Sequence, residues 1–73
     1  MEEYMTTNAE KMLRLIRIVS ADLPDKECRA DSVYTGLSIS TYEARKAILE
    51  LHDRKLIHMS TNKIMYETKI KVV

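Results

Sequence analysis

The chain has 73 residues, of which 45% are hydrophobic, and it contains one glycine, one proline and one cysteine. This composition excludes a disordered or loop-rich chain, and the length corresponds to one small domain. A single cysteine excludes an internal disulfide and a cysteine-rich zinc site, and we expect Cys28 to pack as a small hydrophobic residue. Without a signal peptide or an apolar run that could span a bilayer, a reducing cytoplasm is the expected compartment and no membrane partner is expected.

The net charge of +1 is low for a protein that binds nucleic acid, but the charges are unevenly distributed. Residues 1–42 carry five Lys or Arg against seven Asp or Glu, a net charge of −2. Residues 43–73 carry seven against four, a net charge of +3. The second half of the chain is therefore the half in which phosphate contacts are expected.

The first half of the chain predicts a flexible tail over residues 1–6 and then a helix. Thr7 and Glu10 form a capping box that opens this helix, which runs to about Ser20. Its apolar residues cover more than one face, so the helix either lies in the middle of the domain or offers an apolar stripe to a partner. These residues are Met12, Leu13, Leu15, Ile16, Ile18 and Val19.

A connector and a second helix are expected next. Pro24 ends any helical run within the connector, residues 21–26. A short helix is predicted around Glu27–Thr35, with Asp25 as its cap and with Ala30, Val33 and Tyr34 facing inward. Gly36, the only glycine, follows directly and is expected to adopt the left-handed conformation that often ends a helix.

Residues 40–54 predict an amphipathic helix in the position of the second helix of a helix-turn-helix. Ser40 and Glu43 form a capping box at its start. The helical period places four apolar residues on one side, namely Ala44, Ala47, Ile48 and Leu51. It places the following residues on the opposite side: Tyr42, Arg45, Lys46, Leu49 and Asp53.

The exposed side of this helix has the chemistry to read DNA. Arg45 can bond guanine with two hydrogen bonds, Lys46 can reach guanine or phosphate, and Tyr42 can bond phosphate or pack on a thymine methyl group. Thr41 is also expected to face the major groove, and the backbone N–H of Ser40 is expected to meet phosphate. An ordinary solvated face is the alternative interpretation of the two basic residues.

After the helix the hydrophobic period changes from 3.6 to 2, which predicts a β-hairpin. Its parts are a strand over Leu56–Met59, a polar turn over residues 60–63 and a longer strand over Ile64–Val72. As the wing of a winged helix, this hairpin would contact phosphate through Lys63 at its tip, and through Lys69 and Lys71 where they face the duplex. The alternative is that the hairpin only closes the core.

Catalytic and metal-binding arrangements are not found in the sequence. His52 and His58 stand six residues apart on different predicted elements, with no second cysteine or matched carboxylate. Cys28 has no base partner, and one glycine cannot build a phosphate-binding loop. We therefore expect no enzyme activity, no metal and no cofactor.

A short motif suggests a family. Tyr42-Glu43-Ala44-Arg45 at the start of a helix, followed by aliphatic residues and then by Leu56-Ile57, resembles the Tyr-x-Ala-Arg signature of small winged-helix regulators of enterobacterial pilus and fimbrial operons, the PapI/FaeA type. The resemblance covers about residues 33–57 and implies a transcriptional regulator that acts together with a larger DNA-bound regulator. Lys55 stands where winged helices usually have a glycine before the Leu-Ile pair, which predicts a different helix end.

The predicted fold is α+β, with three helices followed by a two-stranded hairpin in a single winged-helix domain over residues 1–73. A small third strand between the first two helices is compatible with this plan. The predicted function is sequence-specific binding of double-stranded DNA in transcriptional regulation, with helix 40–54 in the major groove and hairpin 56–72 as the wing. The alternatives are a protein-interaction module, for which exposed Leu49 beside tyrosine and arginine is the argument, and a homodimer through the first helix or strand 64–73.

Overall fold

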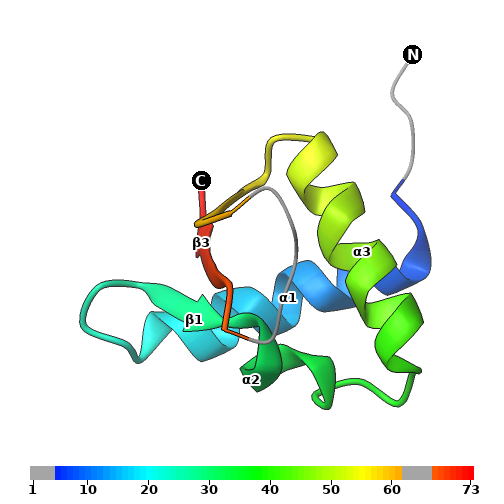
Figure 1. The fold of residues 1–73 in the computed structure, drawn as a ribbon, viewed down its shortest axis with the longest axis horizontal. Helices are drawn as coiled ribbons and strands as arrows, with labels where there is room; N and C mark the ends of the chain where they lie inside the picture. Colours follow the sequence, from blue (N-terminus) through cyan, green and yellow to red (C-terminus); the bar gives the residue numbers. More distant parts are fainter. Residues whose placement is uncertain (1–4, 62–66) are drawn as a thin grey trace.

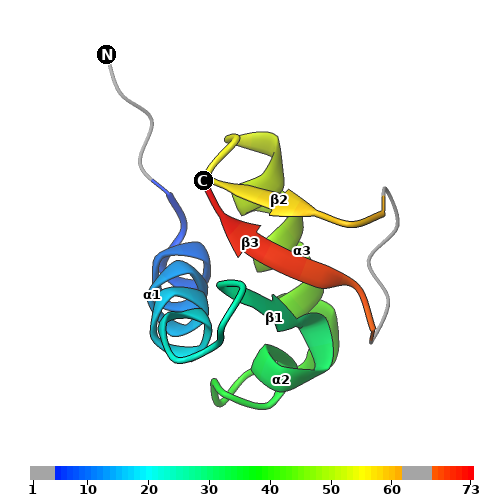
Figure 2. The ribbon, with the colours of Figure 1, turned by 90° about the vertical axis from the view of Figure 1, so that its left-hand side faces the viewer.

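The structure is a computed structural model that describes residues 5–61 and 67–73. It is a small α+β domain in which helices pack against a three-stranded antiparallel sheet (Figure 1, Figure 2). Its elements in chain order are α1 (Thr7–Ala21), β1 (Glu27–Arg29), α2 (Ala30–Tyr34), α3 (Thr41–Asp53), β2 (Ile57–Met59) and β3 (Lys69–Val72). None of the helices in the described ranges has the length and the apolar character needed to cross a membrane.

The sheet has β3 in the centre, paired with β1 on one side and with β2 on the other. Because side chains alternate along a strand, the register puts the apolar residues on one face and the charged residues on the other. The inner face carries Cys28, Ile57, Met59, Ile70 and Val72. The outer face carries Glu27, Arg29, His58, Lys69 and Lys71.

The core lies between the inner face of the sheet and the helices α1 and α3. The four residues predicted for the buried side of α3 are all buried, which confirms the helical period as the signal for that face: Ala44, Ala47, Ile48 and Leu51. From α1 the core takes Ala9, Met12, Leu13 and Ile16, whereas Ile18 is 61% exposed. Of the six apolar residues predicted for this helix, Ile18 therefore lies outside the core, and Leu15 and Val19 are only partly buried against it.

The segment predicted as one helix around Glu27–Thr35 is in fact a strand followed by a shorter helix. Its first three residues form β1, where Glu27 lies opposite Lys71. Asp25 accepts a hydrogen bond from the N–H of Glu27 (3.2 Å) and so holds the turn before the strand, instead of capping a helix. This strand is the small third strand between the first two helices with which the predicted plan was compatible. The helix predicted from Glu27 was wrong at its start, because the strand is specified by a partner forty or more residues later. The inward-facing residues predicted for α2 are confirmed: Ala30, Val33 and Tyr34 are buried.

The predicted capping residue of the first helix, Thr7, is also wrong, because Thr6 takes that place. The Thr6 hydroxyl accepts a hydrogen bond from the N–H of Ala9 (3.2 Å). The same residue is bonded to Glu50, and Met5 is half-buried against the core. The last two residues assigned to the tail are therefore part of the packed domain.

Gly36 does not adopt the predicted left-handed conformation, since no glycine has a positive φ. A Cβ built at this position would overlap the side chain of Leu15 on α1. The absence of a side chain at Gly36 therefore serves close packing between the loop after α2 and α1, rather than a special backbone conformation.

The end of α3 is a left-handed turn in which Lys55 takes the position that usually favours glycine. Lys55 has φ 61°, its N–H donates to the carbonyl of His52 (2.9 Å), and the N–H of Leu56 donates to the carbonyl of Leu51 (3.0 Å). These two bonds form a Schellman motif. The absence of a glycine predicted that this helix would end in another way, but the helix ends in the usual left-handed turn. Lys55 adopts this conformation in place of a glycine, at a cost in free energy.

We expect Lys55→Gly to raise the free energy of unfolding by about 0.5–1 kcal/mol. The left-handed conformation costs an ordinary residue about 1–2 kcal/mol, and the greater freedom of glycine in the unfolded chain cancels part of that gain. Urea denaturation followed by circular dichroism measures the difference. Lys55→Ala is the control, because it removes the same charge and keeps a Cβ; if it stabilised the protein as much, backbone strain would not be the cause.

Candidate nucleic-acid interface

The candidate site begins at the N-terminus of α3, which Ser40 caps as predicted. The Ser40 hydroxyl accepts a hydrogen bond from the N–H of Glu43 (3.1 Å) and donates one to Oε1 of the same residue (3.3 Å). The cap therefore fixes both the first turn of the helix and the position of the Glu43 carboxylate. Thr41 follows as the first helical residue and is exposed.

The acidic residue in the first turn of α3 is turned toward the start of α1. Oε2 of Glu43 accepts a hydrogen bond from Nδ2 of Asn8 (3.4 Å), so both carboxylate oxygens are bonded to other parts of the domain. The hydrogen bonds from Ser40 and Asn8 offset part of the negative charge of this carboxylate. This charge would otherwise repel an anion approaching the end of the helix.

The exposed face of α3 brings together the side chains predicted from the helical period. Tyr42 is 70% exposed, and the Nζ of Lys46 lies 5.5 Å from the centre of its ring, one turn later along the helix. Arg45 is exposed between them in the sequence, and Leu49 is 38% exposed one turn beyond Lys46. The contact with the Tyr42 ring pre-orients Lys46, because a cation is attracted to the face of an aromatic ring.

Two hollows adjoin this face. One, of about 150 Å³, lies between the start of α1 and α3 and is lined by Thr6, Asn8, Glu43, Lys46, Ala47 and Glu50. The other is an open depression lined by Lys46, Leu49, Glu50, Asp53 and Arg54. The first is partly enclosed but smaller than the pockets that usually hold a small molecule, and the second is close to an open surface.

The basic residues after α3 are only partly placed. Lys63 lies outside the described residues, as does the rest of segment 62–66, which includes the second half of the predicted turn over residues 60–63 and the start of the predicted second strand. Within the described residues that strand begins only at Lys69, the first residue of β3. Lys69 and Lys71 are exposed on the outer face of the sheet.

Arg29 is a further basic residue that could not be predicted from the sequence, and the sheet register places it directly opposite Lys69. Arg29 forms an exposed ion pair with Asp31 (2.9 Å). Like charges opposite one another on a sheet are unfavourable, so the Asp31 carboxylate offsets part of this repulsion. No local pattern could have found this pair, because the two strands are forty residues apart.

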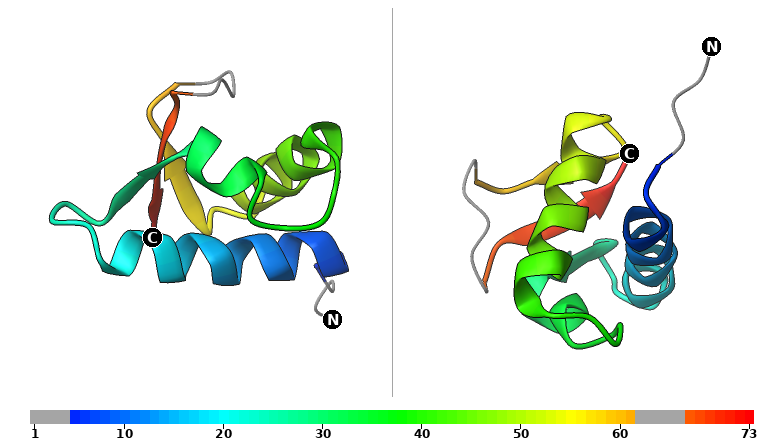
Figure 3. Two further views of the ribbon diagram at one scale, coloured as in Figure 1. Left: turned by 90° about the horizontal axis from the view of Figure 1, so that it is seen from below. Right: turned by 90° about the vertical axis from the view of Figure 1, so that its right-hand side faces the viewer.

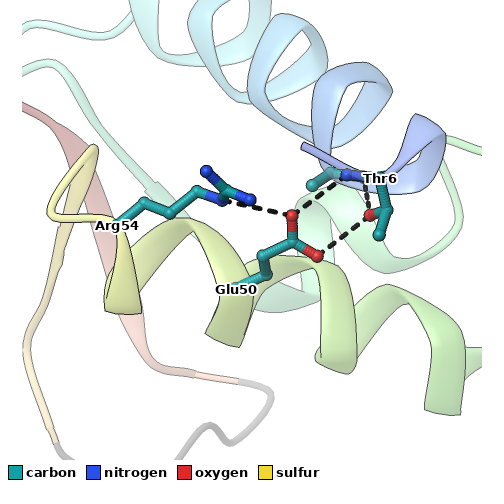
Figure 4. Close-up of polar contacts among 4 residues, drawn as sticks. Thr6, Glu50 and Arg54 are labelled. Carbon is teal, nitrogen blue, oxygen red and sulfur yellow. Dashed lines mark hydrogen bonds and ion pairs between the residues drawn. The ribbon is translucent and has the colours of Figure 1, made fainter. Parts of the chain in front are cut away.

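A polar network that the sequence also did not reveal ties α1 to α3 through Glu50 (Figure 4). The Glu50 carboxylate accepts hydrogen bonds from the N–H of Thr6 (3.1 Å) and from its hydroxyl (3.0 Å). It also forms an ion pair with Arg54 (3.3 Å), which lies four residues later at the C-terminal end of α3. The hydrogen bond from the Thr6 N–H lowers the pKa of Glu50 most, partial burial raises it, and the Thr6 hydroxyl and the Arg54 charge lower it further.

This lowered pKa predicts a loss of stability in acid. A carboxyl group with a lower pKa in the folded protein stabilises the fold fully above its unfolded pKa, and this contribution is lost as the pH falls through the folded value. We expect Glu50→Gln to lower the free energy of unfolding by about 1 kcal/mol at about pH 7 and by much less at about pH 3. Urea denaturation at both pH values measures this.

Glu10→Gln is the control for this prediction, because Glu10 is an exposed carboxylate in the first turn of α1. This substitution should change the free energy of unfolding by no more than about 0.5 kcal/mol at either pH value. An equal loss for Glu50→Gln at both pH values would contradict a role for the charge of Glu50 and would leave only a role for its shape.

Metal-binding and thiol chemistry find no support in the geometry. Over residues 5–61 and 67–73, no three His, Cys, Asp or Glu side chains are close enough together to hold a metal ion. Cys28 is buried on β1, and this burial raises the pKa of its thiol, while a backbone hydrogen bond lowers it. A protonated, buried thiol is a poor nucleophile.

Comparison of the chain with protein-family models, with curated proteins and with solved structures finds no match.

Proposed function

We propose that this protein is a DNA-binding transcriptional regulator of the winged-helix type, in which α3 enters the major groove. The observation that supports this most is the make-up of the exposed face of α3. Tyr42, Arg45 and Lys46 project from its first two turns, which is the part of a recognition helix that meets base edges. The neighbouring acid, Glu43, is bonded to Ser40 and Asn8.

The arrangement around α3 supports the same proposal. The short helix α2 comes before α3 and is joined to it by a six-residue loop, and the antiparallel pair of β2 and β3 comes after α3. In this proposal Ser40 and Thr41 meet the duplex at the start of the helix, Lys63 contacts phosphate from the wing, and Lys69 adds a further phosphate contact. The resemblance of residues 42–45 to the pilus-operon regulators agrees with this assignment, and the larger regulatory partner of those proteins is part of the proposal.

Fluorescence anisotropy on a labelled pool of random-sequence duplexes tests the proposal. Binding should weaken steeply between about 50 and about 200 mM salt, because each neutralised phosphate releases counterions. The double variant Arg45→Ala/Lys46→Ala should weaken binding by about tenfold at the lower salt concentration and reduce the salt slope by up to about two units.

The matched control is Lys11→Ala/Arg17→Ala, which removes the same charge from exposed positions on α1. This variant should bind the duplex pool as the wild type does. Equal weakening by both double variants would mean that only net charge matters, and an absence of binding by the wild type at both salt concentrations would refute the proposal.

A protein-interaction module is the second candidate, and exposed Leu49 favours it. This leucine borders the open depression that Asp53 and Arg54 also line, and tyrosine and arginine beside an aliphatic residue are frequent in interface hot spots. Binding to a partner through Leu49 would depend little on salt, whereas binding to DNA depends on it strongly.

A further inference from the structure

The outward-facing side of α1 carries an unusual combination of residues. Ile18 is 61% exposed, and three exposed basic residues precede it on the same helix: Lys11, Arg14 and Arg17. We call these four residues the α1 outer face. Within the described residues, none of the three cations forms an ion pair. Within the described residues of this helix, the exposed acids Glu10 and Asp22 lie at its two ends, in its first turn and just after its last.

Helical geometry makes these residues one surface. Arg14 and Ile18 are four positions apart and so are direct neighbours on the helix, and Lys11 and Arg14 are three apart. Leu15, three positions before Ile18, is half-buried against the loop at Gly36 and extends the apolar surface toward the domain. An exposed isoleucine beside arginines has the chemistry of a protein interface, because interfaces combine an apolar centre with polar surroundings and are enriched in arginine.

The α1 outer face points away from the exposed face of α3. The two helices pack against each other and both contribute buried residues to one core, so each exposed face points away from that core on its own side of the domain. In the left-hand view of Figure 3, α1 runs along one edge of the molecule and the other described elements lie on one side of it. A ligand on α3 and a ligand on the α1 outer face can therefore be bound at the same time.

The chemistry of the face selects among the possible occupants. A DNA backbone would satisfy the cations but would leave Ile18 against phosphates, which gains nothing from apolar burial. A second copy joined through this face by a two-fold axis would place three cations against the same three cations. A lipid surface would meet a single exposed aliphatic side chain, whereas membrane-surface helices present a whole apolar face.

We infer that the α1 outer face binds a partner protein through a segment that carries an aliphatic or aromatic side chain flanked by carboxylates. The apolar side chain packs on Ile18 and Leu15, and the carboxylates pair with Arg14 and Arg17 by bidentate hydrogen bonds. This site does not depend on DNA binding by α3, so the two proposals stand or fall separately.

Selection from a random peptide library displayed on phage tests the inference, with the full chain as bait. The enriched peptides should share an apolar residue with Asp or Glu within one helical turn on either side. A synthetic, fluorescein-labelled peptide of the consensus then serves as the probe in anisotropy titrations. Arg14→Glu/Arg17→Glu and Ile18→Ser should each weaken its binding by about tenfold or more.

Matched controls keep the test specific. Lys69→Glu/Lys71→Glu makes the same charge reversal on the sheet, and Leu49→Ser removes an exposed aliphatic side chain from α3. Both should bind the probe peptide as the wild type does, and circular dichroism should show that all four variants are folded, since every substituted side chain is exposed.

Each other outcome overturns the inference. Enrichment of peptides without acidic residues, or of none at all, would exclude an acidic partner segment. Loss of duplex binding in the two α1 variants would make this face a DNA contact. Concentration-dependent dimerisation that Ile18→Ser abolishes would make it a contact between two copies, and binding of anionic vesicles that Arg14→Glu/Arg17→Glu abolishes would make it a membrane contact.

Discussion

Ile48→Ala is expected to lower the free energy of unfolding by about 2–4 kcal/mol. Ile48 is fully buried at the middle of the stripe by which α3 packs on the rest of the domain. The substitution removes apolar contacts and leaves a cavity that neighbours such as Met12 and Ile16 can fill only in part. A domain of this size has a total stability of only about 4–11 kcal/mol, so this single change removes a large share of it.

Leu49→Ala is the matched control, since it removes the same number of carbon atoms from the next residue of the same helix. Leu49 is 38% exposed, and its loss should cost about 0.5 kcal/mol. Urea denaturation followed by circular dichroism gives both values. If the two variants were equally destabilised, the assignment of the buried and exposed sides of α3 would be wrong.

Lys71→Pro is expected to unfold the sheet and to lower the free energy of unfolding by about 2–3 kcal/mol or more. Lys71 is exposed, so no packing is lost with its side chain. It lies in the central strand β3, opposite Glu27 on one side and His58 on the other. Proline removes the backbone N–H that a central strand uses for pairing, and its ring does not fit between two neighbouring strands.

Lys71→Ala separates this backbone effect from the loss of the lysine itself. An exposed substitution of this kind should change the stability by about 0.5 kcal/mol at most. Far-ultraviolet circular dichroism and urea denaturation measure both variants. A folded Lys71→Pro protein with the stability of the alanine variant would contradict the central position of β3.

The parts of the fold that depend on neighbours in the sequence could be predicted. The buried stripe of α3 follows from the helical period, and its start follows from Ser40 and Glu43, because both signals act over one or two turns. The inward side of α2 was predicted for the same reason. The charged and apolar sides of β3 also follow from strict alternation at Lys69, Ile70 and Lys71.

The errors lie where a distant residue decides the local structure. A small strand between the first two helices was compatible with the predicted plan, but nothing near Glu27 places it there, because the partner Lys71 comes more than forty residues later. Thr6 caps α1 instead of Thr7, and Thr6 is the threonine that is hydrogen-bonded to Glu50, 44 residues away. The prediction that Gly36 adopts a left-handed conformation was wrong. The close approach of Leu15 on α1 explains the lack of a side chain at this position instead.

The candidate site divides in the same way. The exposure of Tyr42, Arg45 and Lys46 could be predicted, because it follows from their positions relative to the buried stripe. The hydrogen bond between Glu43 and Asn8 could not be predicted, because the two residues lie on different helices and are 35 positions apart in the sequence. The contribution of Lys63 stays a prediction.

The central position of β3 has a consequence for the order in which the protein can fold during synthesis. β1 and β2 do not pair with each other, and each has β3 as its partner in the described sheet. A ribosome makes β3 after both of them, so a nascent chain that ends before Lys69 has two strands without a partner and lacks Ile70 in its core. The helices can form early, but the apolar side chains of Cys28 and Ile57 lack their neighbours on β3 until that strand is made, and an unpaired strand edge with exposed apolar side chains favours aggregation during that interval.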